Sequence, residues 1–163
     1  MPIKSALLLL LTSLVLFNTA VSKSKETVLK PLVNTASLSY SVEGSFEEVK
    51  EDLVMAIESQ GAVISYIAHS SEMLNRTAIT LNIKKKVYQD AAIVLFCKAE
   101  ISHKMVQADP HSLSLCPYPI AIYTLADSPN TVYLTIRKPP ENLPTYSAIQ
   151  EFLLKVIAET IEF

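Results

Sequence analysis

Glycine is scarce in this sequence, with 2 glycines and 9 prolines among 163 residues. A glycine-rich loop that cradles a nucleotide phosphate is therefore excluded, and so is a fibrous or low-complexity chain. The chain also lacks an excess of charge, because 14 Lys and Arg stand against 16 Asp and Glu for a net charge of −2. Without a basic surplus to release counterions from phosphates, we expect no nucleic-acid partner.

The common catalytic motifs are absent as well. The sequence contains no nucleophile elbow, no phosphate loop and no zinc-protease helix. Asp109 and His111 are spaced so that they could act as an acid–base pair, but a helix that ends at Asp109 before Pro110 explains the aspartate without chemistry. The sequence therefore favours a protein that is not an enzyme, without deciding the question.

Hydrophobic residues are abundant, at 50% of the chain, and one long apolar run lies close to the N-terminus. Lys4 precedes an apolar stretch over residues 6–17, and Ala20-Val21-Ser22 follows it as a small-x-small site. This pattern predicts a signal peptide over residues 1–22 that is cleaved after Ser22, although cleavage after Ala20 fits nearly as well. An uncleaved membrane anchor is the alternative. We expect an exported product, periplasmic or secreted, with no stable membrane span after cleavage.

The rest of the chain predicts one domain over residues 37–163, after a mature N-terminal arm over residues 23–36. Apolar and polar residues alternate from Ser37 to Glu43, as in a half-buried strand. A capping box over residues 45–48 then begins a helix with one apolar face, and Gly61 is placed to end it. Thr145 is expected to cap a second long helix, whose apolar stripe runs to Ile161.

Several shorter elements are predicted between these helices. Residues 82–89 are expected to form a loop that holds Lys84, Lys85 and Lys86, where lysines are usually just solvated. The other elements are a strand buried on much of its surface over 62–68, a short helix or turn over 70–80, a buried strand over 91–96, a helix over 100–108, and a hairpin of strands 115–125 and 131–137 joined by a polar turn at 127–130.

This order predicts a single small α+β domain. We expect a mainly antiparallel sheet with the two long helices packed on one of its faces.

Soft side chains concentrate between positions 97 and 116. Both cysteines, two of the three histidines and one methionine lie there: Cys97, His103, Met105, His111 and Cys116. Thiolate, imidazole and thioether ligands suit copper, zinc or a haem iron. The spacing matches no known finger, however, and side chains two apart on a helix, such as His103 and Met105, do not face the same way.

Three interpretations of the cysteines stay open at this point. A disulfide between Cys97 and Cys116 would stabilise the fold by about 3 kcal/mol in the chain-entropy model. Free buried thiols are the second interpretation, and a metal, haem or redox role is the third. Met105 on the inner face of a short helix is typical of core packing. Tyr118 and Tyr123 are candidates for aromatic contact with a ligand.

The same region carries a family resemblance. Residues 94–99, 104–110 and 115–123, together with the capping box, resemble the domain of unknown function 302 (DUF302) family. The resemblance implies a small α+β domain similar to the TATA-binding-protein-like fold, with the order β-α-β4-α, and formation of a homodimer. The chain departs from the family pattern at Lys98-Ala99, where many members have Asn-Pro, and at Cys116, which precedes Pro117.

Together these features predict a non-catalytic accessory protein of the cell envelope. We expect it to bind a small ligand or an envelope protein near the edge formed by residues 97–118. The alternative is a metal-, haem- or thiol-redox protein that uses Cys97 and Cys116, helped by His103, Met105 or His111. The sequence identifies no cofactor.

Overall fold

One antiparallel sheet and four α-helices make up the part of the chain that the computed structural model describes, residues 31–33, 36–138 and 144–163. The elements follow one another as β1 (Leu32–Val33), β2 (Ser37–Glu43), α1 (Phe46–Ser59), β3 (Val63–Ala68), α2 (Ser70–Ala78), β4 (Tyr88–Cys97), α3 (Ala99–Ala108), the 3₁₀ helix η1 (Pro110–Leu115), β5 (Tyr118–Leu125), β6 (Ser128–Arg137) and α4 (Pro144–Glu162).

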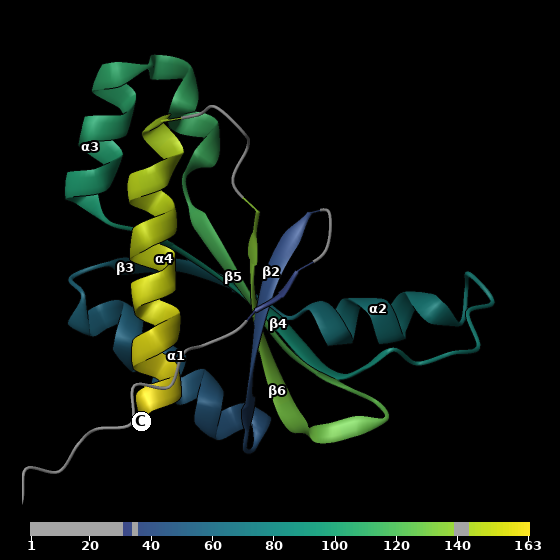
Figure 1. The fold of residues 1–163 in the computed structure, drawn as a ribbon. Coiled ribbons are helices and arrows are strands. Elements are labelled where there is room, and N and C mark those ends of the chain that lie inside the picture. Colours follow the sequence, from purple (N-terminus) through teal and green to yellow (C-terminus); the bar gives the residue numbers. More distant parts are fainter. Residues whose placement is uncertain (1–30, 34–35, 139–143) are drawn as a thin grey trace, which may run out of the picture.

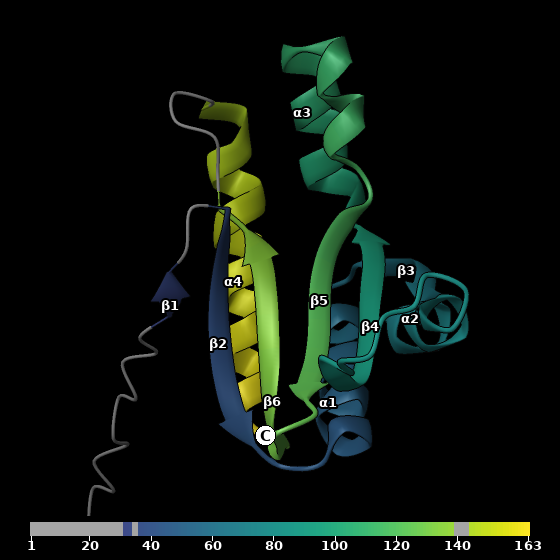
Figure 2. The same ribbon diagram turned by 90° about the vertical axis from the view of Figure 1, so that its right-hand side faces the viewer.

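The strands lie in the order β1-β2-β6-β5-β4-β3, and every neighbouring pair is antiparallel. Helices α1 and α4 cover one face of this sheet, whereas α2 points away from them (Figure 1). The view turned by 90° shows α4 behind β2 and β6, and α1 behind β4 and β5 (Figure 2). The predicted α+β domain, with its antiparallel sheet and two long helices on one face, is confirmed.

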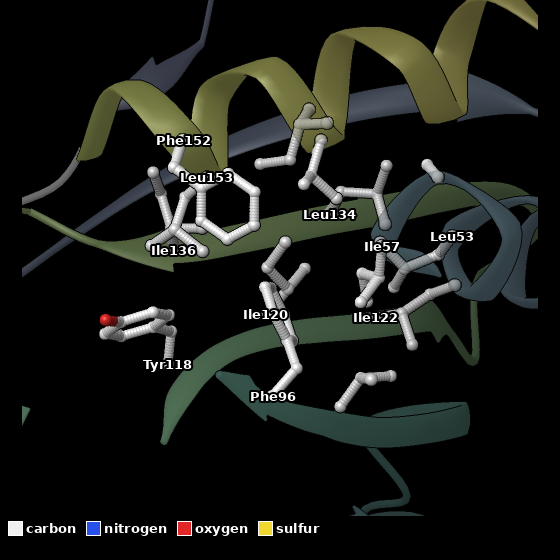
Figure 3. Packing of buried hydrophobic residues seen from close by; sticks show 14 of the residues in the cluster. Leu53, Ile57, Phe96, Tyr118, Ile120, Ile122, Leu134, Ile136, Phe152 and Leu153 are labelled. Atoms are coloured by element: carbon white, nitrogen blue, oxygen red, sulfur yellow. The ribbon is translucent and has the colours of Figure 1, made fainter. Parts of the chain in front are cut away.

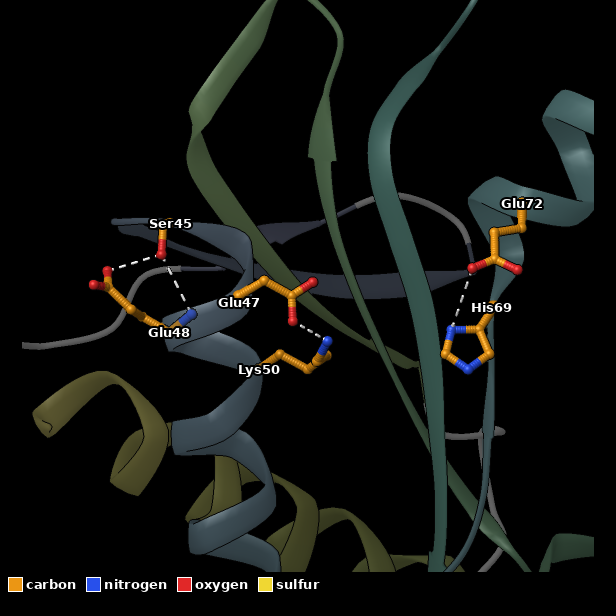
Figure 4. Close-up of polar contacts among 6 residues, drawn as sticks. All are labelled: Ser45, Glu47, Glu48, Lys50, His69 and Glu72. Carbon is orange, nitrogen blue, oxygen red and sulfur yellow. Dashed lines mark hydrogen bonds and ion pairs between the residues drawn. The ribbon is translucent and has the colours of Figure 1, made fainter.

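Helix α1 begins at the predicted capping box. The Ser45 hydroxyl accepts a hydrogen bond from the Glu48 backbone N–H at 3.3 Å and donates one to the Glu48 carboxylate at 2.8 Å (Figure 4). The Glu48 carboxylate therefore accepts its hydrogen bond from the Ser45 hydroxyl, whereas in the standard capping box it accepts one from the backbone N–H of the capping residue. At the other end, Gly61 has a φ of +70°, and its N–H donates to the Glu58 carbonyl at 2.9 Å. That left-handed conformation is the reason for a glycine at this position.

The core fills the space between the sheet and the helices α1 and α4. Every second residue of β5 from Tyr118 to Thr124 is buried, as expected for a strand with one covered face. Figure 3 shows how its isoleucines pack against side chains from both helices, and the fully buried members include Leu53, Ile57, Ile120, Ile122, Leu134 and Leu153. Each such side chain contributes about 1.5–3 kcal/mol through burial, so the predicted apolar faces of both helices supply the core.

A polar contact joins the two long helices beside this core. The Glu159 carboxylate on α4 accepts hydrogen bonds from the Ser59 hydroxyl at 2.6 Å and from the Gln60 amide at 2.5 Å, at the end of α1. These hydrogen bonds favour the charged carboxylate and lower the pKa of Glu159.

Strand β3 differs from its prediction. It was expected to be buried on much of its surface, but Val63 is 71% exposed and Tyr66 is 62% exposed. The reason is position in the sheet: β3 is an edge strand that pairs only with β4. A run of β-branched and aromatic residues indicates a strand but does not tell an edge strand from a central one.

The hairpin also differs in its boundaries. Residues 110–115 form η1, so β5 begins at Tyr118 and not at Leu115. The turn is shorter than predicted, because β5 ends at Leu125 and β6 already begins at Ser128. Pro129 is tolerated inside β6 because the pairing of β6 with β2 starts only at Thr131.

Two predictions concern the N-terminal region. The predicted signal peptide over residues 1–22, with its predicted cleavage after Ser22, lies outside the described residues. In the described part of the predicted arm, β1 pairs with β2. Among the helices of the described residues, none is long and apolar enough to cross a membrane.

Candidate functional site

The two cysteines lie together at the base of an excursion from the sheet. Cys97 is the last residue of β4, and Cys116 follows η1 directly. Their sulfur atoms are at disulfide-bonding distance, and their Cα atoms are 6.4 Å apart. The sheet causes this approach, since β4 and β5 are antiparallel neighbours whose pairing reaches Phe96 and Tyr118. The geometry therefore fits the first of the three interpretations, a disulfide.

Tyr118 lies inside the core beside this pair. Its side chain is fully buried, and its ring makes edge-on contacts with the rings of Phe96 and Phe152, at centroid distances of 6.4 Å each. Its hydroxyl is 2.9 Å from the Ser102 hydroxyl, which is also 3.8 Å from the Cys116 sulfur. Burial raises the pKa of Tyr118, and the hydrogen bond with Ser102 opposes that rise in part.

The remaining candidate residues point in different directions. Met105 is 3% exposed and belongs to the core, as its position on the inner face of the helix predicted. His103 and His111 are exposed. In the described part of the chain, no group of three or more His, Cys, Asp or Glu residues is placed to hold a metal ion.

Asp109 has a structural role that accounts for its position before Pro110. Its carboxylate accepts hydrogen bonds from the His111 backbone N–H at 2.9 Å and from the Ser112 hydroxyl at 3.3 Å. Asp109 is thus the N-cap of η1. The hydrogen bond to His111 involves the backbone and not the imidazole, so it does not form the acid–base pair considered from the sequence.

The chain between the cysteines, residues 98–115, is here named the α3–η1 lobe. It extends past the end of the sheet, next to the first turns of α4 (Figure 2). Met105 packs in the core, and the Ser102 hydroxyl lies beside that of Tyr118. The exposed side chains of the lobe include His103, His111 and Leu113, and Leu113 is 65% exposed. The lobe therefore presents polar and apolar side chains to solvent from two short helices whose ends are held together.

Sequence reasoning singled out Tyr123 but missed the row of tyrosines to which it belongs, on the other face of the sheet. Tyr123 stacks on Tyr133 with ring centroids 5.3 Å apart, and Tyr88 contacts Tyr123 edge-on at 5.2 Å. The Thr135 hydroxyl lies 2.7 Å from that of Ser39. The strand alternation could have revealed this row, because Tyr123 and Tyr133 have the parity opposite to the buried residues of their strands.

A second feature absent from the sequence interpretation is a groove of about 350 Å³ beside α2. One side is formed by α2, and the other by the chain that returns to β4. It lies on a different element from the α3–η1 lobe and contains none of the predicted site residues.

Comparison with known proteins places this architecture in a family. The family model described as "Domain of unknown function DUF302" matches residues 38–162. A crystal structure of an uncharacterized conserved DUF302 protein from Bacillus stearothermophilus is similar, with a TM-score of 0.55, 15% sequence identity, and coverage of 76% of this chain and 95% of the other. That likeness supports the fold alone, and no curated protein matches. Because the family model spans most of its length, the chain belongs to the DUF302 family.

Proposed function

We propose that this protein is an exported accessory protein of the cell envelope that acts by binding a partner protein and not by catalysis. The observation that carries the proposal is the placement of Cys97 and Cys116 at disulfide-bonding distance across the base of the α3–η1 lobe. Disulfides form and persist outside the reducing cytosol. The pair therefore agrees with the exported location that the N-terminal apolar run predicts.

The lobe has the properties of a preorganised binding element. A covalent tie at its base reduces the conformational freedom that binding would otherwise remove, so less entropy is lost on association. Its outer surface offers an exposed leucine, Leu113, and two exposed histidines, His103 and His111. An apolar side chain beside polar ones is a common composition for a protein contact.

The burial of Tyr118 favours a protein partner over a small ligand at this edge. The ring is fully buried and its hydroxyl is already hydrogen-bonded to Ser102, so neither is available to a ligand. Recognition at the lobe therefore depends on its exposed side chains, among them Leu113, His103 and His111.

Photo-crosslinking in cells tests this proposal. A photoreactive phenylalanine analogue is introduced at Leu113 in the lobe, and at Val63 on the edge strand as a control of similar exposure. We expect one discrete crosslinked product of the envelope fraction from the Leu113 position, absent from the Val63 position. That product should weaken when both cysteines are replaced by serine. Equal crosslinking from both positions, or recovery of the protein in the cytosol, contradicts the proposal.

One contact favours a second candidate, a thiol-redox protein. The Ser102 hydroxyl lies 3.8 Å from the Cys116 sulfur, where it could stabilise a thiolate after reduction. Thiol titration and metal analysis of the protein from its native compartment separate the two functions. Two titratable thiols with stoichiometric metal or a haem absorbance support the second candidate. No thiols and no metal support the first.

A further inference from the structure

Exposed apolar side chains concentrate on residues 73–87, here named the α2 arm, which comprise α2 after Glu72 and the chain that follows it. Ile79 is 88% exposed and Leu81 is 66% exposed, which is unusual for aliphatic side chains of this size. The exposed large apolar residues of the arm are Met73, Leu74, Ile79, Leu81, Ile83 and Val87. A contiguous segment of this kind is typical of an interaction surface and not of solvated loops.

The α2 arm is also basic. It contains Arg76, Lys84, Lys85 and Lys86 but no Asp or Glu, in a chain whose net charge is −2. The ion pairs of the described residues are Lys50–Glu47, His69–Glu72 and Lys104–Glu100, so none of the three consecutive lysines forms an ion pair. Lys86 donates to the Gln89 amide oxygen at 3.1 Å, which leaves its charge in place.

Backbone hydrogen bonds hold the tip of the arm in a defined turn. The Ile83 N–H donates to the Ala78 carbonyl at 2.9 Å, and the Asn82 N–H donates to the Ile79 carbonyl at 3.2 Å. Asn82 has a φ of +53°, the left-handed conformation that asparagine tolerates better than most residues. The exposed side chains at the tip are therefore held outward by local structure, and α2 itself points away from the two core helices (Figure 1).

The groove beside α2 brings the two kinds of side chain together. Its lining includes the apolar Leu74, Leu81 and Ile83 and the basic Lys84 and Lys85. Apolar surface next to unneutralised cations fits a ligand that carries negative charge at one end and hydrocarbon at the other. An anionic phospholipid has this arrangement, since its phosphate lies directly above its acyl chains.

We propose that the α2 arm docks the protein on the surface of an anionic phospholipid bilayer. The aliphatic side chains at the tip enter the boundary between headgroups and acyl chains, while the lysines contact the phosphates. A single membrane-binding feature gives only marginal and reversible association with a bilayer. Apolar insertion combined with a basic cluster makes the association stable. The arm supplies both signals on one short segment, away from the α3–η1 lobe.

Tryptophan fluorescence tests the proposal at the α2 arm itself, with the chain that begins after Ser22. The chain contains no tryptophan, so Leu81→Trp introduces a single reporter at the tip of the arm. Leu113→Trp is the matched control, because Leu113 is 65% exposed but lies on the α3–η1 lobe. With vesicles of phosphatidylcholine and phosphatidylglycerol, we expect the emission of the Leu81→Trp protein to shift to shorter wavelength and that of the Leu113→Trp protein to stay unchanged.

The contribution of the lysines is measured in the same Leu81→Trp background. Replacing Lys84, Lys85 and Lys86 by glutamine should weaken partitioning into anionic vesicles by about 100-fold, from about fivefold for each basic residue near the surface. The charge-matched control replaces Lys104, Lys138 and Lys155, which are exposed elsewhere on the protein, and should change partitioning by only a few fold.

Several results would overturn the proposal. They are an unchanged Leu81→Trp spectrum with anionic vesicles, an equal shift with pure phosphatidylcholine, or an equal shift at Leu113→Trp. A shift produced by short duplex DNA and not by vesicles would replace the membrane with a nucleic acid. Ile79→Trp is a second reporter at a position that is 88% exposed, so loss of folding in one variant does not leave the question open.

Discussion

Removal of the Cys97–Cys116 link should destabilise the protein by an amount that follows from the length of chain it closes. The two residues are 19 positions apart. In the chain-entropy model a loop of this size stabilises the folded state by about 3 kcal/mol relative to the open chain. For a domain of this size that corresponds to a fall of roughly 6–12 °C in the melting temperature.

The assay is urea unfolding of the protein and of the variants Cys97→Ser, Cys116→Ser and the double variant. Each single change already breaks the link, so each should lower the free energy of unfolding by a similar amount, and the double change should add little. Treatment of the unaltered protein with a reductant should produce the same loss. Strictly additive single effects, or an unaltered protein that is insensitive to reductant, would refute the reasoning.

Other parts of the structure lead to further predictions. Phe96→Ala should cost about 3–5 kcal/mol of unfolding free energy, because its fully buried ring contacts two other rings, whereas Leu113→Ala should stay within about 0.5 kcal/mol in the same urea assay. Glu159→Gln should lower the melting temperature at pH 7. Because the pKa of Glu159 is lowered in the folded state, the difference between the two proteins should disappear as the pH falls through that lowered pKa. An equal difference in melting temperature at acidic pH would contradict the assignment. Burial raises the pKa of Tyr118, so stability should fall above about pH 10, where the unfolded chain ionises first. Tyr118→Phe should make that fall shallower in melting curves recorded across the alkaline range, and an unchanged slope would count against it.

The two long helices could be predicted from the sequence because local rules and the global fold agree there, except that α4 begins at Pro144, and Thr145, predicted as its cap, lies inside it. Ser45 and Gly61 mark the ends of α1 through hydrogen bonds and a backbone conformation that depend only on near neighbours. The apolar stripes of α1 and α4 repeat with the helical period, so their buried faces were also predicted correctly.

The sequence-based predictions were wrong where the position of an element in the sheet determines its burial and its boundaries. Val63 and Tyr66 belong to an edge strand, and no feature of residues 62–68 distinguishes an edge from the centre of a sheet. Pro129 was placed in a turn because proline usually interrupts strands, but β6 extends past the end of its β2 neighbour and tolerates it.

The candidate site was predicted from residue types alone. The structure brings some of these residues together and places the others apart. The cysteines meet because β4 and β5 are neighbours, which the hairpin pattern alone does not show for strands separated by an excursion. Met105 packs inward while His103 is exposed, as their spacing on a helix indicated. The apolar and basic side chains of the α2 arm were passed over, because solvation is the usual state of a lysine-rich loop and exposure cannot be read from sequence.

We propose above all that the protein functions outside the cytosol with Cys97 and Cys116 joined. The most direct test is a thiol count by maleimide labelling of the denatured protein, trapped from fractionated cells before air oxidation. We expect a processed chain in the envelope or external fraction with no reactive thiol, and two reactive thiols after reduction. An unprocessed chain in the cytosolic fraction with two reactive thiols before reduction would contradict it.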